Sequence, residues 1–149
     1  RALWAAGVIA EILLLLRMRG LAKRLGPQKL LMIGAAGACL RWFATGLEPP
    51  LPLLFLVQTL HALSFAATYM GTIEFIDRAA PARLVNTAMT INSTAGVGAM
   101  TGIATIGAGF LFENVGASVA WFAMSAMAAA GLACAIGLSR LWNGTKLFE

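Results

Sequence analysis

The sequence predicts an all-α fold, a polytopic membrane bundle of helices. Hydrophobic residues make up 60% of the 149 residues, whereas charged residues make up 11%. Soluble globular chains have about 25% charged residues, so this chain has too little polar surface to cover its apolar side chains in water. The apolar residues also form long runs, most of them close to the roughly 20 residues that a helix needs to cross a bilayer.

Five such runs follow one another without a linker or room for a soluble domain. The first run starts at once, is shorter than the others and follows Arg1 rather than a Met. We therefore expect residues 1–149 to form one transmembrane domain, a fragment that lacks upstream helices. The expected spans are about Ala2–Leu16, Leu30–Leu47, Leu51–Ile76, Leu84–Phe112 and Gly116–Leu141.

Breaker residues and charges mark the connections between these spans. Gly26-Pro27 precedes the second span, and Glu48-Pro49-Pro50 separates the second from the third. Asp77–Arg83 and Glu113–Gly116 form the last two connections. The third span is long enough to tilt in the bilayer, and the fourth includes an interfacial first turn.

Basic residues alternate along the connections. The first and third connections and the C-terminal tail carry Arg and Lys, whereas the second and fourth carry only the acids Glu48 and Glu113. The positive-inside rule then places the basic connections and the C-terminus in the cytoplasm. Five spans that end inside the cell require the chain to enter from outside.

The same patterns argue against several other classes of protein. The net charge is +5, but the basic residues lie between apolar runs rather than along a nucleic-acid-binding face. Cys39 and Cys134 lie in apolar stretches without a CxxC or Cys/His cluster. We therefore expect no metal, no cofactor and no nucleic-acid partner. An integral-membrane enzyme would need a metal or acid cluster, and neither a paired-Asp nor a His-rich motif is present.

Three ionisable residues interrupt different apolar runs: Glu11, Arg41 and His61. A charge inside a span costs roughly 2.5–3.5 kcal/mol on the lenient insertion scales. Such residues face the bundle interior or a wet cavity, where they pair with one another. They predict a polar site inside the bundle that binds a solute or moves a proton.

The third span carries a stripe of polar residues. Spacings of three and four place them on one helix face, and such a face lines a cavity because lipid offers no hydrogen bonds. The alternative, favoured for Thr68 and Thr72, is that they only bond neighbouring helices. For His61 we favour a functional role, because an imidazole can transfer a proton. The stripe contains Gln58, His61, Ser64 or Phe65, Thr68 and Thr72.

The first two spans offer further candidate residues. Trp4 and Glu11 share a face with Gly7 and together could hold a ring-shaped solute, with the carboxylate accepting hydrogen bonds. The alternative is an interfacial Trp4 and a Glu11 that is protonated or paired with a cation. Arg41 stays protonated, so it needs a counter-charge, either Glu11 in a structural ion pair or a substrate carboxylate. In the fourth span, Gly98 and neighbouring small residues are typical of close helix packing.

Four stretches are similar to a known family: the run from Leu3 to Leu14, Leu40-Arg41-Trp42, Gln58 to Phe65, and Ala108 to Phe112 followed by Val115-Gly116. They resemble the 3-phenylpropionate-type permeases, relatives of lactose permease in the major facilitator superfamily. The resemblance covers essentially the whole chain, as helices eight to twelve. It implies five transmembrane helices of the C-terminal half of a twelve-helix fold with alternating access.

The resemblance also implies roles for individual residues. Glu11 matches the sugar-contacting acid of lactose permease, and Arg41 and His61 match residues linked there to substrate binding and proton coupling. That protein has an acid three residues after the His, where this chain has Ser64. The proton-carrying role of that acid has no counterpart here, and Glu11 remains as the acid at mid-membrane depth.

We therefore expect a secondary active transporter, a proton-coupled symporter of a small organic solute such as an aromatic acid. The substrate-binding candidates are Glu11, Trp4, Arg41, His61, Gln58 and Ser64, and the proton-coupling candidates are Glu11 and His61. The expected partners are the lipid bilayer, the solute, protons and the upstream helices of the same polypeptide, in a bacterial inner (plasma) membrane. A sugar or nucleoside permease and a non-transporting structural bundle are the alternatives.

Overall fold

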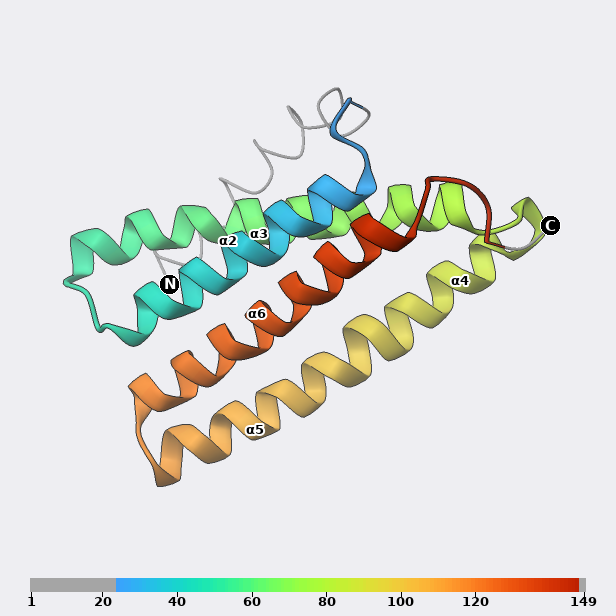
Figure 1. The fold of residues 1–149 in the computed structure, drawn as a ribbon. Coiled ribbons are helices and arrows are strands. Elements are labelled where there is room, and N and C mark those ends of the chain that lie inside the picture. The colour runs from blue at the N-terminus through green and yellow to red at the C-terminus, as the bar shows by residue number, and fades with distance from the viewer. Residues whose placement is uncertain (1–23, 148–149) are drawn as a thin grey trace.

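The computed structural model describes residues 24–147, and every regular element in that range is helical (Figure 1). The order along the chain is α2 (Pro27–Gly46), α3 (Leu51–Ala79), the 3₁₀ turn η1 (Ala82–Leu84), α4 (Val85–Ile91), the π-helix η2 (Asn92–Ala99), α5 (Met100–Asn114) and α6 (Ala117–Leu141). These helices bear out the predicted all-α class. The first expected span, Ala2–Leu16, lies outside the described residues.

The helix ends follow local rules that sharpen the expected spans. Helix α2 begins at Pro27 rather than at Leu30, because proline suits the first turn of a helix, where its missing N–H is not needed. Helix α3 extends to Ala79, and the N–H of Ala80 still bonds the carbonyl of Ile76 at 2.9 Å. Pro81 follows. Helical dihedral angles are unfavourable for the residue before a proline, here Ala80, so the helix ends at Ala79.

The fourth span is not a uniform α-helix. The helical run from Ala82 to Asn114 matches the expected Leu84–Phe112, but its middle part, η2, is π-helical. A π-helix bonds each N–H to a carbonyl five residues earlier and is rare at this length. The segment Asn92–Ala99 therefore presents its side chains in a different register from that of α4 and α5.

Three helical runs in the described chain are long and apolar enough to cross a membrane: Leu51–Ala79, Ala82–Asn114 and Ala117–Leu141. Helix α2 is not among them; it carries Lys29 and Arg41. Large apolar side chains lie on the outside of the bundle, with Ile106 76% exposed. Lipid tails are the medium in which such surfaces are stable, so the chain is a multi-pass membrane protein.

Helix α2 lies at the centre of the packing, against α3 on one side and α6 on the other, and α5 packs on α6 (Figure 1). Small residues carry the contact between α2 and α3. Gly34 faces Thr68, Gly37 faces Ser64, and Gly71 faces Leu30. Small residues let helix backbones approach closely, which is how helices associate where lipid removes the hydrophobic driving force.

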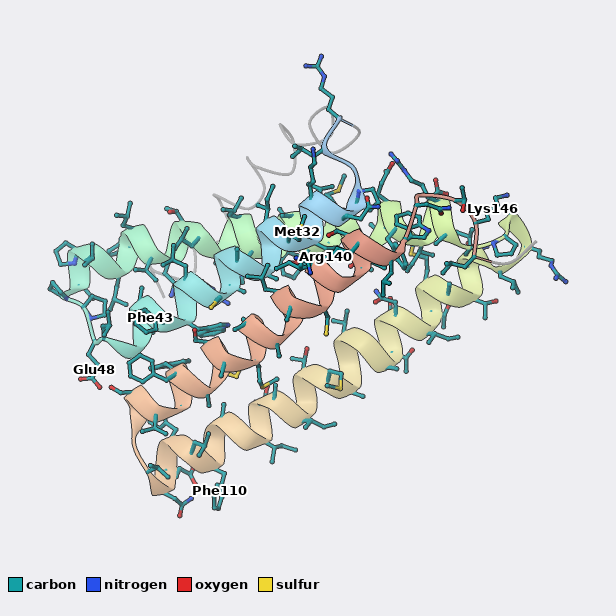
Figure 2. All side chains as sticks on the ribbon, viewed as in Figure 1. Met32, Phe43, Glu48, Phe110, Arg140 and Lys146 are labelled. Carbon is teal, nitrogen blue, oxygen red and sulfur yellow. The ribbon has the colours of Figure 1, made fainter. Side chains whose placement is uncertain are left out.

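The two ends of the bundle differ in charge. At one end, the Ser118 hydroxyl donates to Oε1 of Glu48 at 2.7 Å, which joins the α2–α3 turn to the start of α6. At the other end, the N–H of Leu147 bonds the carbonyl of Ala79 at 2.9 Å, which ties the tail to the end of α3. Figure 2 shows Glu48 and Lys146 at opposite ends. The connections expected to be acidic and basic are thus separated in space.

Candidate functional site

The polar stripe of α3 faces a cavity of about 520 Å³. Helix α2 contributes Arg41 to this cavity, which we call the polar cavity, and the π-helix η2 lines another side of it. Residues distant in sequence therefore border the same cavity. The polar and aromatic side chains that line it are Arg41, His61, Ser64, Phe65, Thr68, Tyr69, Thr72, Asn92 and Ser93.

Arg41 brings a positive charge to the polar cavity. Within residues 24–147 no carboxylate lies at ion-pair distance from it, and its buried Nε has no hydrogen-bond partner. Its guanidinium carbon lies 3.9 Å from the centroid of the Trp42 ring. The ion pair of this part of the chain joins Arg78 to Glu74 at the end of α3. Arg41 is therefore available to a counter-charge from a ligand or from the rest of the protein.

A row of aromatic rings runs along α3 beside Arg41. His61 and Phe65 have ring centroids 5.9 Å apart, and Phe65 and Tyr69 stack at 6.1 Å with an interplanar angle of 7°. Their i, i+4, i+8 spacing places all three on one helix face. All three line the polar cavity, so its α3 wall is a ladder of rings rather than a row of hydroxyls alone.

Ser64 and Thr68 border both the cavity and the helix contact. Ser64 is buried, and its hydroxyl donates to the carbonyl of His61 at 3.0 Å. That bond occupies the only proton the hydroxyl can donate, so Ser64 presents mainly acceptor lone pairs to the cavity. Thr68 lies directly over Gly34 of α2, so the packing of the two helices sets its position.

The π-helix supplies a wall that the sequence interpretation missed. Asn92 and Ser93 line the polar cavity with Gly96 and Val97. The available signal was the polar triplet Asn92-Ser93-Thr94 inside an apolar span, because unneeded amide and hydroxyl groups are costly in lipid. π-helical turns occur frequently at functional sites.

The predicted substrate residues fall into three groups. Arg41, His61 and Ser64 line the polar cavity together. Gln58 lies on α3, partly buried, but is not among the residues that line this cavity. Trp4 and Glu11 lie outside the described residues.

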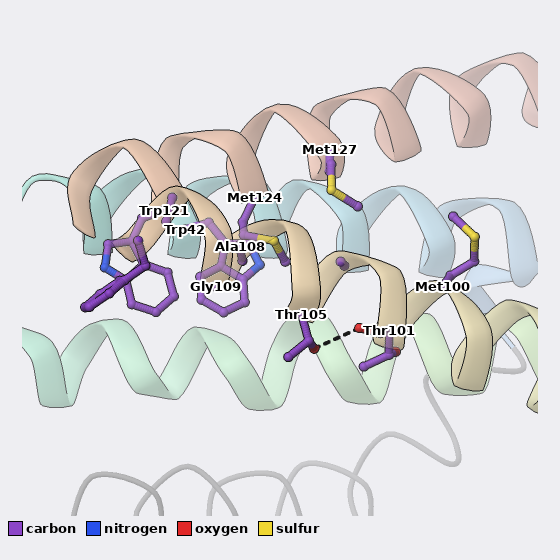
Figure 3. A pocket seen from close by; sticks show the side chains of 12 residues that line it. Trp42, Met100, Thr101, Thr105, Ala108, Gly109, Trp121, Met124 and Met127 are labelled. Atoms are coloured by element: carbon purple, nitrogen blue, oxygen red, sulfur yellow. Dashed lines mark hydrogen bonds between the residues drawn. The ribbon is translucent and has the colours of Figure 1, made fainter. Parts of the chain in front are cut away.

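A second cavity, of about 640 Å³, lies where α5 and α6 meet α2 (Figure 3). Figure 3 shows that Trp42 and Trp121 form one end of it, with Met124 and Met127 further along. We call it the apolar cavity, because its walls are aromatic, methionine and small side chains, with the two threonines of α5 as the polar exceptions. The Thr105 hydroxyl is already bonded to the carbonyl of Thr101 at 2.8 Å.

The small-residue face of the fourth span lies on the same run of helix. A Cβ added at Gly102 or at Gly109 would have no atom within 4 Å among the described residues. The expected close packing of this face with another helix is therefore absent from the part of the chain that the structure describes. Across residues 24–147, no three His, Cys, Asp or Glu side chains lie close enough together to hold a metal ion.

Comparison with known proteins gives one family and two relatives. The model of the MFS_1 like family matches residues 1–123. The "Probable 3-phenylpropionic acid transporter" of Escherichia coli (strain K12) is 29% identical over 119 residues, which are 80% of this chain and 31% of that protein. The "Maltose permease" of Geobacillus stearothermophilus is 27% identical over 103 residues, which are 68% of this chain and 26% of that protein.

The chain thus spans less than a third of the length of either relative. No solved structure shows a significant match to it.

Proposed function

The chain belongs to the MFS_1-like family, and on that premise we propose that it forms helices eight to twelve of a secondary active transporter for a small aromatic acid. The fraction of each relative that it matches supports a position within a longer protein. The upstream helices would supply the other half of the site. The transporter would work in a bacterial inner membrane, with the C-terminus in the cytoplasm.

One observation carries this proposal: the cation of Arg41, which has no ion-pair partner within residues 24–147, and the ring ladder of α3 line the same cavity. A guanidinium binds a carboxylate through two parallel N–H groups. The flat faces of Phe65 and Tyr69 offer a surface on which an aromatic ring packs in offset or edge-on geometry. A molecule with a carboxylate at one end and a ring at the other fits both features.

The proton part of the proposal rests on the sequence. By the resemblance noted above, Glu11 falls where lactose permease has its sugar-contacting acid, and His61 lines the cavity beside Arg41. We propose that in the full-length protein the Glu11 carboxyl group lies near Arg41, so that binding of an anionic solute would change the affinity of Glu11 for a proton. We assign proton coupling to Glu11, with His61 assisting, and keep Trp4, Gln58 and Ser64 as candidate substrate contacts.

A sugar permease is the second candidate, because one relative is named a maltose permease. Sugar sites satisfy hydroxyl groups with carboxylates and amides. Among the described residues, the polar cavity contains the amide of Asn92 but no Asp or Glu. The positive charge of Arg41 and the aromatic wall favour an aromatic solute that carries a carboxylate over a neutral sugar.

The test uses a full-length protein containing this chain, reconstituted in liposomes with an imposed pH gradient. Uptake of labelled 3-phenylpropionate and of labelled maltose is measured for the parent, Arg41→Gln and Arg140→Gln. Arg140 is a matched control, a cation on the last turn of α6 that is exposed and does not line the cavity.

We expect the parent to accumulate the acid and not the sugar. A charged hydrogen bond contributes roughly 1.5–3 kcal/mol, so Arg41→Gln should raise KM for the acid by about 10- to 100-fold. Arg140→Gln should keep the parental KM. Accumulation of maltose without the acid would overturn the acid assignment, as would a parental KM in Arg41→Gln.

A further inference from the structure

Three aromatic or cationic groups from two helices form a continuous stack beside the polar cavity. The guanidinium carbon of Arg41 lies 3.9 Å from the centroid of the Trp42 ring. The Trp42 ring stacks on that of Trp121 from α6, with centroids 5.3 Å apart and an interplanar angle of 7°. Trp121 is in turn met edge-on by Phe112 of α5, at 6.4 Å. The stack therefore links the cation of the polar cavity to the wall of the apolar cavity.

The contact between Arg41 and Trp42 does not follow from their positions in the helix. Neighbouring residues of an α-helix point about 100° apart and do not face each other. The long side chain of Arg41 has to bend across the ring of the next residue to reach this place. The ring of Trp42 is held in turn by Trp121. Packing between α2 and α6 therefore fixes the ring face on which the guanidinium lies.

The N–H groups of a guanidinium lie in the plane of the group. A guanidinium whose central carbon contacts the face of a ring can therefore still donate these N–H groups to hydrogen bonds. The buried Nε of Arg41 has no partner within residues 24–147. The Trp42 contact thus restrains the cation while leaving its donors available. A flexible arginine would lose more side-chain entropy when it binds an anion, because its many rotamers would have to be restricted to one.

We infer that Trp42, supported by Trp121, is a positioning residue that holds the Arg41 guanidinium in the orientation in which it receives the substrate carboxylate. The inference rests on the proposed function and adds to it a determinant of affinity outside the polar cavity. Trp42 does not line the polar cavity; it lines the apolar one. Its effect on the substrate is therefore exerted through Arg41.

The experiment compares variants of the full-length protein in the same liposome assay with 3-phenylpropionate. Trp42→Leu removes the ring, whereas Trp42→Phe keeps a ring face for the guanidinium. Phe43→Leu is the matched control, because Phe43 pairs with Phe122 across the same two helices, with centroids 5.5 Å apart, and is the next residue along α2. The Phe43 ring forms no stack with Arg41.

A cation–π contact contributes about 0.5–2 kcal/mol, so Trp42→Leu should raise KM by about 2- to 30-fold while Vmax stays within about twofold. Trp42→Phe should restore KM to within about threefold of the parent, since phenylalanine also offers a ring face. Phe43→Leu should keep the parental KM. Trp121→Leu, which leaves the Arg41–Trp42 contact in place but removes its support, should raise KM by a smaller factor.

Two results would overturn the inference while leaving the proposed function in place. One is a parental KM in Trp42→Leu when Arg41→Gln has lost affinity. The other is an equal fall of Vmax in Trp42→Leu and Phe43→Leu without a change of KM, which indicates a structural role. If Trp42→Leu does not fold, a parental KM in Trp121→Leu overturns it. A parental KM in Arg41→Gln overturns the proposed function itself.

Discussion

Gly34 of α2 and Thr68 of α3 meet with no room for a side chain between their helices. A Cβ added at Gly34 would lie 2.8 Å from the backbone nitrogen of Thr68 and 3.1 Å from the carbonyl oxygen of Ser64. Both neighbours are backbone atoms, which cannot rotate away. Because Ser64 and Thr68 also line the polar cavity, the contact between the helices and the shape of the site depend on the same glycine.

The first prediction follows from this contact. Gly34→Ala should push α3 away from α2 and lower the free energy of unfolding by about 1–3 kcal/mol, the usual cost of overpacking. The measurement is the midpoint of thermal unfolding in detergent. Gly37→Ala is the control, because the nearest atoms to its added Cβ lie at 3.6 Å, an ordinary contact. Equal midpoints for the two variants would show that the helices separate without cost.

The second prediction concerns orientation in the membrane. The Glu48 turn and the tail near Ala79 lie at opposite ends of the bundle. Because basic connections stay in the cytoplasm, cysteines introduced at Glu48 and Glu113 should react with an impermeant thiol reagent in sealed cells. A cysteine at Arg83 should react only after permeabilisation. The background of Cys39 and Cys134 is removed first by replacement with alanine. Labelling of position 83 in sealed cells would contradict the prediction and show that the helices have the opposite orientation.

The third prediction concerns proton coupling. Glu11→Gln should abolish accumulation driven by a pH gradient but leave exchange of internal for external solute, because the amide is close in shape but binds no proton in this pH range. His61→Gln should weaken solute affinity or coupling, since the amide keeps hydrogen bonds but cannot titrate. The measurement is uptake in vesicles with and without the gradient. If the Glu11→Gln variant accumulates solute as well as the parent protein does, Glu11 is not the proton-coupling residue.

The membrane fold could be predicted from composition and run length alone. Lipid requires helices with apolar surfaces, and four of the expected spans coincide within a few residues with helical runs of the structure, three of which are apolar enough to cross a membrane. The differences at the ends have local causes, such as Pro27 in the first turn of α2 and Pro81 after α3. The first expected span, with Trp4 and Glu11, stays a prediction.

The site could be predicted less completely, because spacing along one helix gives the direction of a side chain but not what lies opposite. The stripe from His61 to Thr72 does line a cavity, whereas Gln58 on the same stripe does not. The opposite wall comes from η2, whose π-helical turns depend on a shift in the hydrogen-bond pattern of a long helix. No periodicity of apolar residues reveals that shift.

The stack of Arg41, Trp42 and Trp121 was beyond prediction for a different reason. It joins residues 80 positions apart in the chain, and its inner contact contradicts the rule that adjacent helical residues point apart. Only the packing of α2 against α6 brings the two indoles together. Aromatic residues in a membrane span are otherwise interpreted as interfacial anchors.

The absence of α2 from the helices apolar enough to span a bilayer has a consequence for biosynthesis. Lys29 in the first turn of α2 and Arg41 in its second half lower the hydropathy of this helix, and charged residues oppose insertion by the translocon. Helix α3 follows after a turn of four residues, between Gly46 and Leu51, and is apolar enough to insert on its own. The nascent chain would therefore deliver α2 to the membrane as one arm of a hairpin, so that the central helix of the finished bundle depends on its successor for entry into the lipid.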